Sequence, residues 1–161
     1  HVADRNKDIL CVVGDGSLMM NLQELQTVKN YKSNPKIIVI NNNMYGIIRK
    51  RQKELFRDRT VGTDATNGVT GTNIKQIAKC FDFKYFKINK KQELKNKLKN
   101  ILKYKGPVIC EIMAILDQDY IEIGYAKNSK GIIVRRPLED QKPFIKREIF
   151  LKEMIIKPID Q

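Results

Sequence analysis

The chain has 161 residues, of which 42% are hydrophobic, and a formal net charge of +13. This length and composition suffice for one globular domain with a core, and no apolar run approaches the roughly 20 residues that cross a bilayer. The lysines are spread along the chain, and no stretch interleaves basic and aromatic residues as nucleic-acid modules do. We therefore expect no membrane partner and no nucleic-acid partner, although the positive charge favours attraction of anionic substrates.

The chain start and the cysteines indicate the setting. The first eight residues are polar and unlike a secretory signal, and the chain begins without Met, as a fragment or processed piece does. Cys11, Cys80 and Cys110 are isolated, odd in number and without a Cys-x-x-Cys pair. We interpret them as reduced core residues of a cytoplasmic protein.

Apolar runs alternate with helical patterns in the first half. Residues 9–13 and 36–40 predict buried strands, and residues 44–56 predict a helix. Ser17 is expected to cap a helix over residues 18–28. The apolar residues of that helix fall on one face at helical spacing: Leu18, Leu22, Leu25 and Val28.

The alternation continues to about residue 115. Residues 57–72 predict a loop, which could close over a substrate or be a plain connection. The remaining predicted elements are a helix over 73–81, a strand over 84–88, a helix over 91–103 with Leu94, Leu98, Ile101 and Leu102 inward, and a strand over 108–115. Strands separated by helices predict an α/β fold, a doubly wound and mostly parallel sheet with helices on both faces. We expect residues 1–115 to form this domain and residues 116–161 an extended tail with a short helix near 146–154.

Two polar groups follow the first two predicted strands. Gly14, Asp15, Gly16 and Ser17 follow the first strand, and Asn41-Asn42 follows the second, with 24 residues between the two groups. The carboxyl ends of parallel strands are where open α/β sheets bind ligands. The glycines allow close backbone approach, and the helix that follows offers free N–H groups to an anion. A carboxylate, an amide oxygen and phosphate oxygens together suit Mg²⁺.

Other interpretations of these residues remain open. Asp15 could be a phosphoacceptor, although no acidic pair precedes it. Gly-Asp-Gly could be a plain turn, Asp15 a helix cap and residues 41–43 a second turn. The P-loop pattern is absent, because no Gly-Lys-Ser/Thr follows the first strand.

The spacing and the surrounding residues resemble a known signature. Gly14-Asp15-Gly16, 24 residues and Asn41-Asn42 resemble the thiamin diphosphate signature, and residues 14–25 and 41–49 are similar to the acetolactate synthase family. Residues 106–111 resemble the last core strand of that family, and residues 136–150 resemble acetolactate synthase-like proteins of surface-saccharide pathways. The resemblance implies a C-terminal, diphosphate-binding domain that is truncated at its N-terminus.

The resemblance also implies roles for individual residues. Asp15 and Asn42 match side-chain ligands of Mg²⁺, and Met44 matches a backbone-carbonyl ligand. Gly14 belongs to the cofactor signature. Gly16, Ser17 and Gly46 match positions that line the diphosphate mostly through the backbone, and Tyr45 borders the cofactor or substrate space.

The implied activity is decarboxylation of a 2-oxo acid such as pyruvate, followed by transfer of the two-carbon unit to a carbonyl acceptor. A 2-oxo acid decarboxylase uses the same cofactor site, and a non-catalytic subunit of a split enzyme is a further alternative. FAD remains open as a second cofactor of the full enzyme. Because the cofactor carries the chemistry, no Ser/His/Asp set is expected, and His1 is not expected to be catalytic.

Two features of the family are missing. The activating glutamate lies on a pyrimidine-binding domain, which must come from another segment or chain, and the first part of the diphosphate domain is also absent. Glu24 lies in the first predicted helix and Glu111 at a buried strand end, so neither is expected to replace that glutamate. We therefore expect this chain to be inactive alone and to act in a homo-oligomer, with the cofactor held between chains.

A basic cluster follows the second polar group: Arg49, Lys50, Arg51 and Lys53. It could attract a carboxylate or a sugar-nucleotide phosphate, or it could be a solvated helix face.

Overall fold

A computed structural model describes residues 8–116, 118, 124–141, 143–156 and 158. The chain divides into two compact units, residues 1–118 and residues 119–161. Within the described residues, no helix combines the length and apolar composition that a bilayer crossing requires.

The first unit is built on a four-stranded parallel sheet. Its strands are β1 (Leu10–Gly14), β2 (Lys36–Asn41), β3 (Lys84–Ile88) and β4 (Val108–Met113). They lie in the order β1-β2-β4-β3, and every pair is parallel. Gly14 pairs with Ile40, so β1 and β2 end side by side at the same edge of the sheet.

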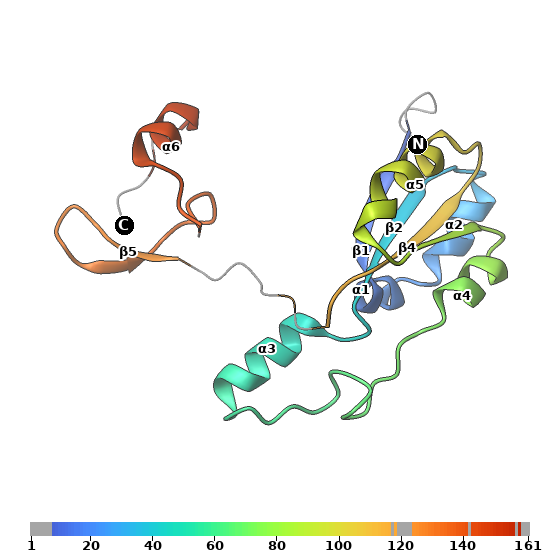
Figure 1. Ribbon diagram of the computed structural model, residues 1–161, viewed down its shortest axis with the longest axis horizontal. Helices are drawn as coiled ribbons and strands as arrows, with labels where there is room; N and C mark the ends of the chain where they lie inside the picture. The colour runs from blue at the N-terminus through green and yellow to red at the C-terminus, as the bar shows by residue number, and fades with distance from the viewer. Residues whose placement is uncertain (1–7, 117, 119–123, 142, 157, 159–161) are drawn as a thin grey trace. The chain divides into compact units, whose positions relative to one another are not determined.

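Helices cover both faces of this sheet, as Figure 1 shows. The helices of the unit are α1 (Asp15–Met20), α2 (Glu24–Asn30), α3 (Gly46–Leu55), α4 (Ile74–Cys80) and α5 (Lys91–Lys103). Residues of α1, α2 and α4 pack with Val39 and Ile109 on one face. On the other face Ile101 of α5 packs with Ile38 and Cys110. The doubly wound α/β fold is therefore confirmed.

The first helical segment differs from its prediction. The helix expected over residues 18–28 is two short helices, because the backbone leaves helical geometry at Asn21, where φ is −132°. β1 runs through Gly14, so α1 already begins at Asp15 and Gly14 is its N-cap residue. Ser17 lies exposed within α1 and is not the cap, so that prediction is wrong.

Several side chains expected in the core are exposed. Cys11 lies on the edge strand β1 and Cys80 at the end of α4, and both are exposed. Only Cys110 of the three free cysteines is buried, and burial raises the pKa of its thiol to about 11. Leu102 is 47% exposed, because Ile101 takes the inward position at this turn of α5.

The second unit contains a hairpin and a helix. The strands β5 (Tyr125–Lys127) and β6 (Ile133–Arg135) pair antiparallel, and α6 spans Arg147–Glu153. The Asp140 carboxylate is buried and accepts hydrogen bonds from the side chains of Arg136 and Arg147. The structure thus has a short helix near the expected residues 146–154, and it folds part of the expected extended tail into a hairpin.

Candidate functional site

The candidate site lies where β1 and β2 end. Asp15 is the first residue of α1, and Asn41 is the last residue of β2. Because Gly14 pairs with Ile40, the chain leaves both strands at the same level of the sheet. The two polar groups of the sequence are therefore adjacent in the structure, as the parallel arrangement predicted.

The Asp15 carboxyl group lies against the backbone that follows β2. Burial raises the pKa of Asp15, and hydrogen bonds from the backbone at Gly16, Asn43 and Asn42 oppose that rise. The carboxyl group thus contacts backbone of the second polar group as well as its own. A partly buried carboxylate in this position would gain from a cation.

The two asparagines differ in role. Asn41 is buried; its Nδ2 donates to Oε1 of Glu111 at 2.6 Å, and its Oδ1 accepts from the backbone N–H of Asn43 at 2.8 Å. Asn42 is half-buried, and its Oδ1 accepts from the backbone N–H of Met44 at 3.3 Å. Asn41 is therefore bonded to a buried strand residue, whereas Asn42 is half-buried and bonds the backbone of the nearby Met44.

A small cavity lies beside these residues. Of the predicted site residues, Asp15, Gly16, Met44 and Tyr45 line it. Asn43 also lines the cavity, as do residues 69–72 of the long loop. Gly14, Ser17, Asn42 and Gly46 are not among its lining residues. The structure thus brings half of the predicted residues to one cavity. The other half are sequence neighbours of the lining residues but do not line the cavity themselves.

Gly16 is required by the close approach of Tyr45. A Cβ atom at Gly16 would lie 2.4 Å from Cε1 and 2.7 Å from Cδ1 of the Tyr45 ring. Such distances are far inside van der Waals contact, so the ring packs directly on the backbone of α1. Gly16 and Tyr45 therefore join the two polar groups by packing.

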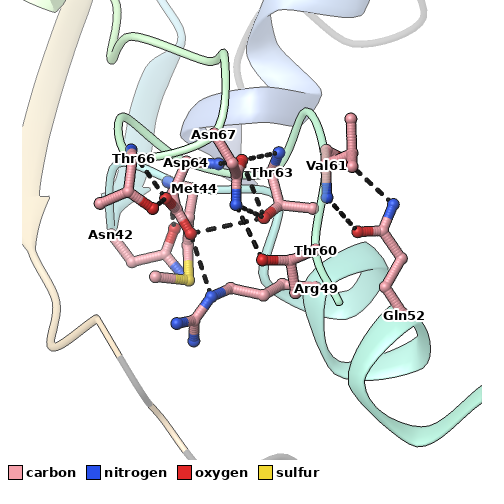
Figure 2. A network of polar contacts seen from close by, with 10 residues as sticks. All are labelled: Asn42, Met44, Arg49, Gln52, Thr60, Val61, Thr63, Asp64, Thr66 and Asn67. Atoms are coloured by element: carbon pink, nitrogen blue, oxygen red, sulfur yellow. Dashed lines mark hydrogen bonds and ion pairs between the residues drawn. The ribbon is translucent and has the colours of Figure 1, made fainter. Parts of the chain in front are cut away.

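The loop over residues 57–72 is attached to the site, as Figure 2 shows. Asp64 forms an isolated antiparallel bridge with Met44, and the backbone N–H of Tyr45 donates to the Thr63 carbonyl at 2.8 Å. Asn67 Oδ1 accepts from the backbone N–H groups of Thr63 and Asp64. This loop is therefore a polar framework for residues 44–45 rather than a plain connection.

The basic cluster is only partly a solvated face. Arg49 Nε lies 3.0 Å from the Asp64 carboxylate, which is buried and also accepts from the backbone and hydroxyl of Thr66. The Thr66 hydrogen bonds, with a smaller effect of Arg49, lower the pKa of Asp64. Lys50 and Arg51 lie within ion-pair distance of Glu54 on the same helix.

Sequence reasoning missed three residues here: Glu111 as a partner of Asn41, Asp64 as a partner of Arg49, and Asn67 as the centre of the loop. The turn-forming residues Asp64, Thr66 and Asn67 were the available signal, since Asp, Thr and Asn side chains bond nearby backbone. Nothing in the local sequence links Glu111 to Asn41, because 70 positions separate them.

The oxygen atoms at the site suit a hard cation that also binds phosphate. In the described part of the chain, no cluster of three or more His, Cys, Asp or Glu side chains could hold a metal ion. The site instead offers one carboxylate on Asp15, an amide on Asn42 and backbone carbonyls. Mg²⁺ is commonly held by one or two carboxylates together with substrate phosphates, so these residues fit such an ion.

A comparison with known protein families identifies the family of the chain. Residues 1–112 match the family model described as the thiamine pyrophosphate enzyme, C-terminal TPP binding domain. The chain therefore belongs to this family of thiamin diphosphate enzymes, and its first unit is the cofactor-binding α/β domain.

Curated relatives point to one branch of the family. The chain is 37% identical over 110 residues to the acetolactate synthase large subunit of Porphyra purpurea. The aligned residues make up 68% of this chain and 18% of that protein. It is 32% identical over 111 residues to the acetolactate synthase isozyme 2 large subunit of Escherichia coli (strain K12), which covers 69% of this chain and 20% of that protein. The chain thus spans about a fifth of the length of these relatives.

Proposed function

We propose that residues 14–17 and 41–46 hold the Mg²⁺ and the diphosphate of thiamin diphosphate in an acetolactate synthase-like enzyme. The observation that carries this proposal is the position of the Asp15 carboxyl group, which is partly buried against the backbone of residues 42–43. An isolated carboxylate loses solvation there, and a cation shared with phosphate oxygens would restore it.

Each residue has a distinct part in this proposal. Asp15 and Asn42 supply side-chain oxygens to the ion, and Met44 supplies its backbone carbonyl. The backbone approaches the diphosphate at Gly14, Gly16, Ser17 and Gly46. Tyr45 borders the cofactor space. Gly16 has no side chain to displace the Tyr45 ring, which agrees with this arrangement.

The proposed reaction is that of the relatives named above. The bound cofactor supplies an electron sink for decarboxylation of a 2-oxo acid such as pyruvate and for transfer of the two-carbon unit to a carbonyl acceptor. The residues of this chain bind and orient the cofactor. The activating carboxylate comes from a pyrimidine-binding domain on another segment or chain, so this chain alone is inactive. We place the complete enzyme in the cytoplasm as a homo-oligomer and in surface-saccharide synthesis.

The test of the site is Asp15→Ala in the complete enzyme, with Met20→Ala as the matched variant at an exposed position of the same helix. Isothermal calorimetry with thiamin diphosphate and Mg²⁺ should show binding lost in Asp15→Ala and kept in Met20→Ala. Unchanged affinity in Asp15→Ala would contradict the assignment.

The test of the reaction is product analysis with pyruvate alone and with added aldehydes. Two-carbon transfer to a carbonyl acceptor is the expected result. Release of acetaldehyde without a coupled product would instead indicate a 2-oxo acid decarboxylase. No turnover after the pyrimidine-binding domain is supplied would indicate a non-catalytic subunit.

A further inference from the structure

A chain of hydrogen bonds runs from the core of the sheet to the loop after β2. Glu111 lies in the middle of β4, opposite Val39 on β2 and Lys87 on β3. Its side chain is 7% exposed, which is unusual for a carboxylate in a parallel sheet. A buried charge of this kind needs several donors to be tolerated.

The donors to Glu111 come from both neighbouring strands. Asn41 Nδ2 donates to Oε1 at 2.6 Å, and the Tyr85 hydroxyl donates to Oε2. Lys87 Nζ lies 3.5 Å from Oε2. Burial, together with the Glu111 hydrogen bond and charge, raises the pKa of Tyr85, so its hydroxyl stays protonated and donates.

Of these contacts, the hydrogen bond to Asn41 leads on to the loop after β2. The hydrogen bond to Glu111 fixes which way the Asn41 amide faces, and the opposite atom, Oδ1, then accepts the backbone N–H of Asn43. Asn43 adopts a left-handed conformation with φ of 55°, which the hydrogen bond to Asn41 helps to hold. Through Asn41, the backbone of the loop at Asn43 is therefore linked to a carboxylate 70 positions away.

We propose that Glu111 is a positioning residue for the metal loop: through Asn41 it sets the conformation of residues 42–44 and so the placement of Asn42 and Met44. Its effect on cofactor binding rests on the proposed function, whereas its effect on the loop does not. In the described part of the chain, the hydrogen bonds that join Glu111 to this loop run through Asn41.

The first readout is amide hydrogen exchange of the full chain by NMR, which requires no cofactor. Glu111→Met has similar length but no acceptor, so Asn41 loses its partner, and exchange of the Asn43 N–H should rise about tenfold. Glu111→Gln keeps an oxygen that can accept from Asn41 Nδ2 and should restore slow exchange. Tyr85→Phe removes the hydrogen bond to the other oxygen, Oε2, and should leave the Asn43 N–H protected.

The second readout is the affinity of the complete enzyme for thiamin diphosphate with Mg²⁺. Glu111→Met should weaken binding about tenfold, which is the effect of roughly one lost hydrogen bond. Glu111→Gln and Tyr85→Phe should stay near the unaltered protein.

These measurements separate the possible failures. Unchanged Asn43 exchange in Glu111→Met would overturn the proposal, as would equal acceleration in Tyr85→Phe, which would show general loosening of the sheet. If Glu111→Met does not fold, Asn41→Asp keeps the side-chain acceptor for the Asn43 N–H but removes the Nδ2 donor to Glu111, and it must accelerate Asn43 exchange. If Asp15→Ala leaves cofactor affinity unchanged, the proposed function fails, and the exchange data still decide the role of Glu111.

Discussion

The two halves of the candidate site are built in different ways. The turn from β1 into α1, residues 14–17, is made of consecutive residues, and its backbone passes directly from strand to helix. The loop from β2 to α3, residues 41–45, is held by distant groups: Glu111 on β4 and residues 63–64 of the long loop. The first half is a local motif, whereas the second half depends on the folded sheet. Changes at Asp15 should therefore act directly on ligand binding, whereas changes at the distant groups that hold the second half should act through loop order.

The largest effect is expected for Asp15→Asn in the first half. Loss of the charged ligand should lower the affinity of the complete enzyme for thiamin diphosphate with Mg²⁺ by about 100-fold or more. Calorimetry measures this affinity. A decrease in affinity of less than about threefold would show that Asp15 is not a ligand of the ion.

The same variant should raise the stability of the cofactor-free chain. The pKa of Asp15 is raised in the folded state. Its favourable contribution is therefore fully present below the pKa of the unfolded chain and is lost as the pH rises through the folded-state pKa. Asp15→Asn should be more stable than the unaltered chain at neutral pH, by a margin that grows with pH over that range. Urea unfolding at several pH values without Mg²⁺ tests the sign, and a less stable variant at neutral pH would refute it.

The next effect is expected for Gly16→Ala, which tests the contact between the two halves. The added Cβ would lie 2.4 Å from the Tyr45 ring, so the ring or α1 must shift. Overpacking of this kind costs about 1–3 kcal/mol of unfolding free energy. In a Tyr45→Ala background, Gly16→Ala should lose most of that cost, because the clashing ring is gone. An equal cost of Gly16→Ala with and without the ring would show that the packing is not the cause.

A smaller effect is expected for Asp64→Asn in the second half. Thr66, with a smaller contribution from Arg49, lowers the pKa of Asp64, so its stabilising effect is present above the unfolded-chain pKa and is lost as the pH falls through the folded-state pKa. The variant should therefore be less stable than the unaltered chain at neutral pH. Its stability should also fall less as the pH is lowered. Thermal unfolding from pH 7 downward measures this change. Asp58→Asn, at an exposed residue near the start of the same loop, is the control and should follow the unaltered chain.

The smallest effect is expected for Ser17→Ala. Ser17 is exposed within α1, and the helix is capped at Gly14 without a side-chain hydrogen bond. The unfolding free energy should change by no more than about 0.5 kcal/mol. A loss near 1–2 kcal/mol in chemical denaturation would restore the role of Ser17 as a helix cap.

Much of the first half could be predicted from the sequence. The apolar runs before Gly14 and Asn41 gave the strands within one or two residues, and parallel pairing then required their ends to meet. The helix start was misplaced because the pattern does not reveal that β1 extends through Gly14. The break at Asn21 was also missed, since Leu18, Leu22 and Leu25 keep a helical period across it.

The second half could be predicted only in outline. Residues 41–45 were placed after β2, but the difference between Asn41 and Asn42 depends on Glu111, which only strand pairing brings near. The pairing of Arg49 with Asp64 likewise requires the path of the long loop. The exposure of Cys11 depends on the strand order, because β1 lies at the sheet edge.

The most direct test of the central claim uses Mn²⁺ in place of Mg²⁺ in the complete enzyme with thiamin diphosphate. If the two strand ends form one metal and diphosphate site, electron–nuclear double resonance should show coupling of the bound Mn²⁺ to phosphorus of the cofactor. That coupling should disappear in Asp15→Ala and persist in Met20→Ala, a change at an exposed position of the same helix. Phosphorus coupling that survives in Asp15→Ala, or bound Mn²⁺ without any coupling in the unaltered enzyme, would contradict the account.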